Sequence, residues 1–190
     1  QRCGSTYGIR TIMHWSGPHL HMVLNHFPSV GVVIALGLFV GAMYLKNEDM
    51  KRATLLLFVL LGLLAVPTYI SGAASRWALR GQADMSPDLI AAHMDAALIA
   101  FTLLGLMGLF AWYALWLARR FAAPPQWPVY TATGLAVLAL LVMIDVGNLG
   151  GMINHPEIRV DLVFAGEGVG RTAAVEDFVR DYGWSWPALE

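Results

Sequence analysis

Four long apolar runs constrain the fold of this chain more than any other feature of its sequence. They cover residues of about 22–45, 53–79, 89–118 and 128–153. A helix of about 20 residues crosses the roughly 30 Å hydrocarbon core of a bilayer, and each run is at least that long. The runs lack the alternation of apolar and polar residues that a membrane barrel strand requires. We therefore predict an all-α integral membrane four-helix bundle, built from two helical hairpins and surrounded by lipid.

The composition agrees with this fold and removes several classes of function. Apolar residues make up 57% of the chain and charged residues only 13%, which is far from the balance of a soluble domain. The net charge of -1 and the absence of a long basic cluster argue against nucleic acid as a partner. The single cysteine, Cys3, excludes an internal disulfide, an iron–sulfur centre held by four thiolates and a covalently attached c-type haem.

The apolar runs divide the chain into three parts. Residues 1–18 form an extramembrane arm, residues 19–155 form the membrane domain, and residues 156–190 form a charged tail outside the membrane. Within the tail, residues 172–182 have the apolar spacing of a short amphipathic helix. Arm and tail are each too short for a domain, so we expect them to dock on other subunits of a membrane complex.

The charges between the spans predict the orientation of the bundle. Residues 46–52 contain three basic side chains, and Arg119 and Arg120 follow the third span. Basic loops usually face the cytoplasm. We therefore expect a bacterial inner-membrane protein with both termini on the periplasmic side.

Two histidines enter the apolar runs at nearly the same predicted depth. His26 lies about 11 Å and His93 about 16 Å from the middle of their spans, on the same side, if each residue rises about 1.5 Å. A b-type haem is held by one imidazole above and one below its iron. His26 and His93 are therefore the first candidate ligands, and His155, near the end of the fourth span, is an alternative ligand.

Other side chains could complete such a site. Residues 71–75 give the second span a small-residue surface that would admit a flat group or a close helix. Arg76 and Arg80 lie four residues apart on one helical face, where they could meet haem propionates. Asp145 and Asn148 share a face of the fourth span, and with Tyr69 they could orient a ligand, form a proton path to a quinone, or simply join helices by hydrogen bonds.

A metal site and a site without any cofactor are the competing interpretations. A copper or zinc site at the outer face could be formed by the histidines able to converge outside the membrane, namely His14, His19, His21, His26 and His155. His19 and His21 are separated by one residue, a spacing that can present two imidazoles to such a metal. Interfacial histidines are also common as polar anchors. In that case the chain is a cofactor-free accessory subunit that fills a position in a larger membrane complex.

Three short motifs resemble a known family. His26-Phe27-Pro28 begins the first span, His93 lies near the start of the third, and the fourth closes on Gly150-Gly151-Met152-Ile153-Asn154-His155. These resemble the four-helix membrane proteins grouped as DUF2231, over roughly residues 19–156. Ser29 after the proline departs from that family's pattern, and the arm and the tail lie outside the likeness. The resemblance implies a four-helix fold with three aligned histidines, and it implies no established activity.

These observations predict a haem b-binding electron-transfer subunit of a larger redox complex, with a quinone as a candidate electron carrier. A single haem near one face cannot carry electrons across the bilayer. We therefore expect a redox or accessory subunit and not an independent enzyme.

Overall fold

The computed structural model describes residues 16–79, 86–122 and 124–155. Its helices are α1 (Gly17–Leu24), α2 (His26–Tyr44), α3 (Glu48–Leu79), α4 (Pro87–Arg120) and α5 (Trp127–Asn154). Four helical segments in this part of the chain are long and apolar enough to cross a membrane: Gly17–Tyr44, Glu48–Ala78, Pro87–Arg120 and Trp127–Asn154. The described chain is helical without strands. The predicted all-α membrane bundle is thus confirmed.

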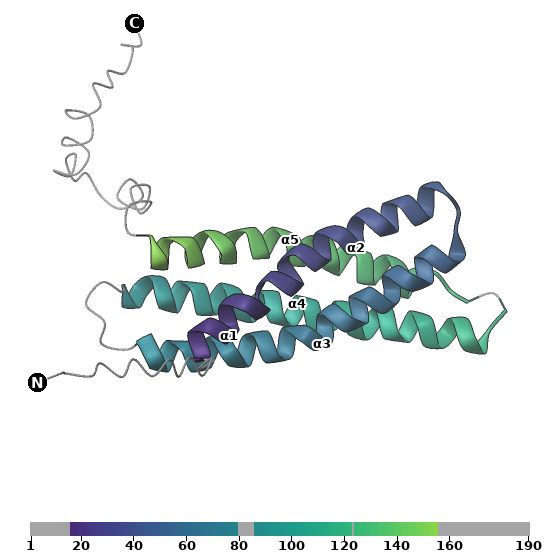
Figure 1. The fold of residues 1–190 in the computed structure, drawn as a ribbon. Coiled ribbons are helices and arrows are strands. Elements are labelled where there is room, and N and C mark those ends of the chain that lie inside the picture. The colour runs from purple at the N-terminus through teal and green to yellow at the C-terminus, as the bar shows by residue number, and fades with distance from the viewer. Residues whose placement is uncertain (1–15, 80–85, 123, 156–190) are drawn as a thin grey trace, which may run out of the picture.

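The spans run antiparallel to their neighbours in sequence, so the bundle has two distinct ends (Figure 1). The start of α1, the end of α3, the start of α4 and the end of α5 lie together, and we call this the histidine end. The opposite end holds the loops after α2 and α4, and we call it the arginine end. The most extensive helix contacts are those of α4 with α3 and with α5, followed by those of α2 with α3.

The first span is interrupted at Asn25, between α1 and α2. Pro28 explains the break, because proline has no N–H to donate to the carbonyl of Leu24 four residues earlier. The Thr68 hydroxyl of α3 shares its single proton between Leu64 O on its own helix, at 2.8 Å, and that same Leu24 carbonyl, at 3.4 Å. The break therefore joins the first span to α3.

Helix ends lie within a few residues of the predicted spans, and the larger differences have clear local causes. The first span begins at Gly17 instead of about 22, with Pro18 in the first turn, where a missing N–H costs nothing. Helix α3 begins at Glu48 instead of about 53, because the Asn47 side chain accepts from Met50 N at 3.0 Å. Helix α4 begins at Pro87, close to the predicted start at about 89, with the Ser86 hydroxyl accepting from Leu89 N at 3.4 Å.

Small residues fill the centre of the bundle and let the backbones approach closely. The buried alanines are Ala35, Ala42, Ala65, Ala100, Ala111, Ala114, Ala132, Ala136 and Ala139. Helices α3 and α4 meet at Gly62 and Gly108, where a Cβ on Gly62 would lie 2.9 Å from Leu104 O. Many large aliphatic side chains are exposed on the outside, as lipid contact requires.

Candidate functional site

The histidine end holds His21 of α1 and His93 of α4. Both side chains are half-buried. Helices α1 and α4 both pack on α3 at this end of the bundle. We refer to these two side chains as the imidazole pair.

Both imidazoles are held through Nδ1 by a main-chain carbonyl of a neighbouring helix. His21 Nδ1 lies 3.1 Å from Thr68 O on α3, with the Ser71 hydroxyl 3.3 Å away. His93 Nδ1 lies 3.1 Å from Val146 O on α5. A carbonyl oxygen can only accept, so Nδ1 carries the proton in both rings and donates it. The neutral imidazole then has its lone pair on Nε2, the atom that binds metals in many such sites.

Both rings also lie against a glycine four residues beyond the accepting carbonyl. A Cβ added to Gly72, four residues after Thr68, would lie 2.9 Å from His21 Cε1. A Cβ added to Gly150, four residues after Val146, would lie 3.3 Å from His93 Cε1. Residues four apart share one face of a helix. We call each such combination of a carbonyl and a glycine a glycine notch. The notch on α3 receives the His21 ring, and the notch on α5 receives the His93 ring.

The helices that carry the imidazole pair do not pack on each other. Helix α1 packs on α3, and every Cα pair between α1 and α4 is more than 8 Å apart. A Cβ on Gly17 would meet Ala74 and Ser75 of α3 at 3.6 Å, so the small-residue surface of residues 71–75 receives α1. That surface was predicted to admit a flat group or a close helix, and in the structure it accommodates the close helix together with the His21 ring.

The structure places the three predicted ligands in different surroundings. His93 belongs to the imidazole pair. His26 is exposed on α2, and its Nδ1 donates to Met22 O on its own span at 2.7 Å. His155 follows the last turn of α5 and is exposed, with its backbone N–H bonded to Gly151 O at 2.9 Å. His93 thus shares its carbonyl-bound and glycine-lined surroundings with His21, whereas equal depth had paired it with His26.

Of the predicted propionate partners, Arg76 lies beside the site. Its Nη1 donates to the sulfur of Met94 at 3.4 Å, and Met94 follows His93 on α4. The guanidinium is exposed at the bundle surface. Arg80, His14, the N-terminal arm up to residue 15 and the predicted tail helix lie outside the described residues.

The remaining predicted residues point elsewhere. The Tyr69 ring stacks on Phe101, with centroids 4.9 Å apart. Asp145 and Asn148 are exposed on α5, and it is the carbonyl of Val146 between them that holds His93. These three residues therefore line the outside or the packing interface of the helices, and not the imidazole pair.

Sequence reasoning missed His21 as a partner of His93. Hydropathy began the first span at residue 22 and left His21 outside it, among candidate metal ligands. The signal that could have moved it inward is Gly17-Pro18, which starts the helix early. The sequence could not show that Gly72 and Gly150 make room for imidazole rings, because the histidines that lie against them are on other helices.

The described residues contain no group of three or more His, Cys, Asp or Glu side chains able to hold a metal ion. A haem iron would need only two ligands from the protein, because the macrocycle would supply the rest, and two imidazole nitrogens could fill that role. Comparison of the whole chain with protein-family models, with curated proteins and with solved structures finds no match. The likeness to DUF2231 therefore stays a prediction.

Proposed function

We propose that the protein is a membrane-embedded electron-transfer subunit of a larger redox complex, with haem b bound between His21 and His93. The observation that carries the proposal is the imidazole pair. Two imidazoles on different helices lie at the same end of the bundle, and both have Nδ1 bonded to a main-chain carbonyl. This arrangement fixes each ring and directs its basic Nε2 to a ligand.

The surroundings of the pair support a flat group between α1 and α4. The backbones of these helices stay apart, so a group held by both histidines need not displace a helix contact. Arg76 reaches α4 one residue beyond His93, where its guanidinium would neutralise a propionate. Haem would supply one-electron exchange at this site, and the protein would fix its orientation and exclude water.

The position of the pair limits the electron path. It lies at one end of the bundle, so it serves exchange on one side of the membrane. A membrane-dissolved quinone is a candidate electron carrier on this side. We infer that the histidine end faces the periplasm of a bacterial inner membrane, because the opposite loops and the helix ends beside them carry five basic residues, and such basic segments face the cytoplasm.

The visible absorption spectrum of the detergent-purified protein, isolated with its native partners, tests the proposal. We expect a Soret band and, after reduction with dithionite, the sharp α and β bands of a low-spin b-type haem. His21→Gln and His93→Gln should each lose most of the bound haem. His26→Gln is the matched control, because His26 is exposed and bonds its own span.

Helix content from circular dichroism separates loss of haem from loss of fold. A featureless spectrum of the wild-type complex would overturn the haem proposal and favour the cofactor-free subunit, or a copper or zinc site if a metal assay is positive. If His21→Gln kept its haem and His26→Gln lost it, the assignment of His21 as a ligand would be overturned, but the proposal that the protein binds haem would stand.

A further inference from the structure

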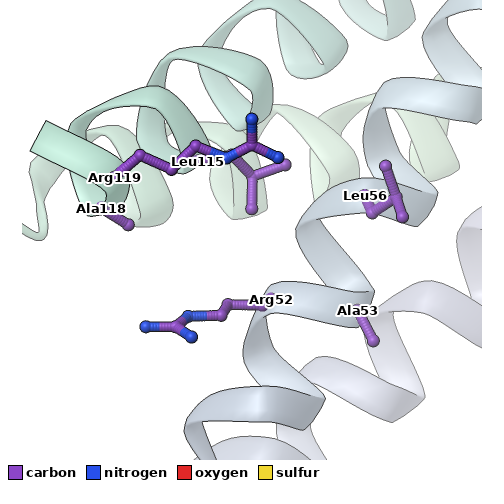
Figure 2. A pocket seen from close by; sticks show the side chains of 6 residues that line it. All are labelled: Arg52, Ala53, Leu56, Leu115, Ala118 and Arg119. Atoms are coloured by element: carbon purple, nitrogen blue, oxygen red, sulfur yellow. The ribbon is translucent and has the colours of Figure 1, made fainter.

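The arginine end holds a groove between α3 and α4 that the electron-transfer proposal does not use. Its volume is about 400 Å³. The residues that line it are Arg52, Ala53, Leu56, Leu115, Ala118 and Arg119. Figure 2 shows one arginine on each helix, with aliphatic side chains of both helices beside them. The groove therefore combines two cations with an apolar wall.

The two guanidinium groups are available for an anion. Arg52 lies 3.9 Å from Asp49, and both side chains are largely exposed, at 62% and 95%. An exposed pair at that distance is weak. Among the described residues, Arg119 has no ion pair. Guanidinium groups bind phosphate through two parallel hydrogen bonds, so two of them can hold one phosphate from both sides.

The surrounding charge favours an anion as well. Residues 45–52 and 117–126 contain five basic and two acidic side chains, a net charge of +3. A second groove of about 350 Å³ shares Arg52, Leu115 and Ala118 with the first and extends to Lys51 and Gln126. Lys51 is paired with Glu48 at 2.7 Å, so the arginines carry the uncompensated charge.

The depth of the groove matches the headgroup region of a bilayer. Its residues lie in the first turns of α3 and the last turns of α4. At the same end, the Tyr113 ring stacks on Trp116 at 5.9 Å and lies 5.8 Å from the Trp127 ring. Such aromatic groups gather at the membrane–water interface. Leu56 and Leu115 then extend from the groove toward the hydrocarbon core.

We propose that this groove binds an anionic glycerophospholipid. The phosphate lies between Arg52 and Arg119, and an acyl chain lies along Leu56 and Leu115. Basic pockets between helices at the cytoplasmic surface recognise such headgroups, and Ala53 and Ala118 leave room for the lipid backbone. The inference stands independently of haem binding.

Native mass spectrometry of the detergent-solubilised protein tests the proposal by titration with phosphatidylglycerol or phosphatidylcholine. We expect phosphatidylglycerol to bind more tightly than phosphatidylcholine. Arg52→Gln and Arg119→Gln should each weaken its binding about fivefold. Arg120→Gln is the matched control: it removes the same charge one residue away, on a side chain that lies over Trp116 at 5.5 Å and outside the groove.

A lysine variant allows lipid affinity to be measured even if a glutamine variant unfolds. Arg119→Lys preserves the charge but removes the paired N–H groups, so its affinity should lie between those of the wild type and Arg119→Gln. Equal losses in Arg119→Gln and Arg120→Gln would overturn the proposal. Equal affinity for the two lipids would do so too, as would full displacement of phosphatidylglycerol by an equimolar amount of inorganic phosphate.

Discussion

At the histidine end of the bundle, two imidazoles are hydrogen-bonded to main-chain carbonyls, whereas at the arginine end two guanidinium groups line an open groove. His21 and His93 each donate to a carbonyl of another helix and lie in a glycine notch. Arg52 and Arg119 line an open groove and have weak protein partners or none among the described residues. A polar group inside the span must find its partner in the protein, while one at the headgroup level can find it in the lipid.

The largest loss of stability should come from filling a glycine notch at the histidine end. Gly72→Ala places a Cβ 2.9 Å from His21 Cε1, so we expect a loss of about 1–3 kcal/mol in the free energy of unfolding. Gly134→Ala is the control, because nothing lies within 4 Å of its added Cβ. There, alanine should stabilise α5 by up to about 1 kcal/mol. Denaturant titration in detergent, followed by circular dichroism, measures both, and a stabilising Gly72→Ala would contradict the notch.

A smaller effect should come from removing one helix cap at each end. Asn47 caps α3 at the arginine end with a 3.0 Å bond, and Ser86 caps α4 at the histidine end with a 3.4 Å bond. Replacing either by alanine should cost about 1 kcal/mol, with Asn47→Ala the costlier because its bond is shorter. The same titration measures the two losses. The reverse order would show that cap strength here follows the surroundings of each helix and not the bond length.

The smallest effect should come from the ion pair of the arginine end. Glu48→Gln removes the negative charge from the 2.7 Å contact with Lys51. Because the carboxylate is 68% exposed, we expect a change of at most about 0.5 kcal/mol, which shrinks further in high salt. Unfolding titrations at low and high salt measure it. A change above about 1 kcal/mol would mean that this end is held by its charges, as the histidine end is by hydrogen bonds.

The sequence predicted the spans because lipid imposes one simple requirement on every span, a long run of apolar residues. It did not predict the pairing of His93. Depth along a span follows from counting residues, but the direction of a side chain depends on helix rotation, and the break that Pro28 causes at Asn25 lies directly before His26.

By itself, the sequence determined that this chain is a bundle of four membrane spans with basic loops at one end, because hydropathy and charge act on each segment separately. Only the tertiary structure decided which polar side chains meet. His21 reaches its site because Gly72 on α3 leaves room for the ring, and His93 because Gly150 on α5 does the same. The groove of Arg52 and Arg119 likewise exists only where α3 and α4 lie side by side. Such juxtapositions depend on contacts between distant residues, which no local pattern contains.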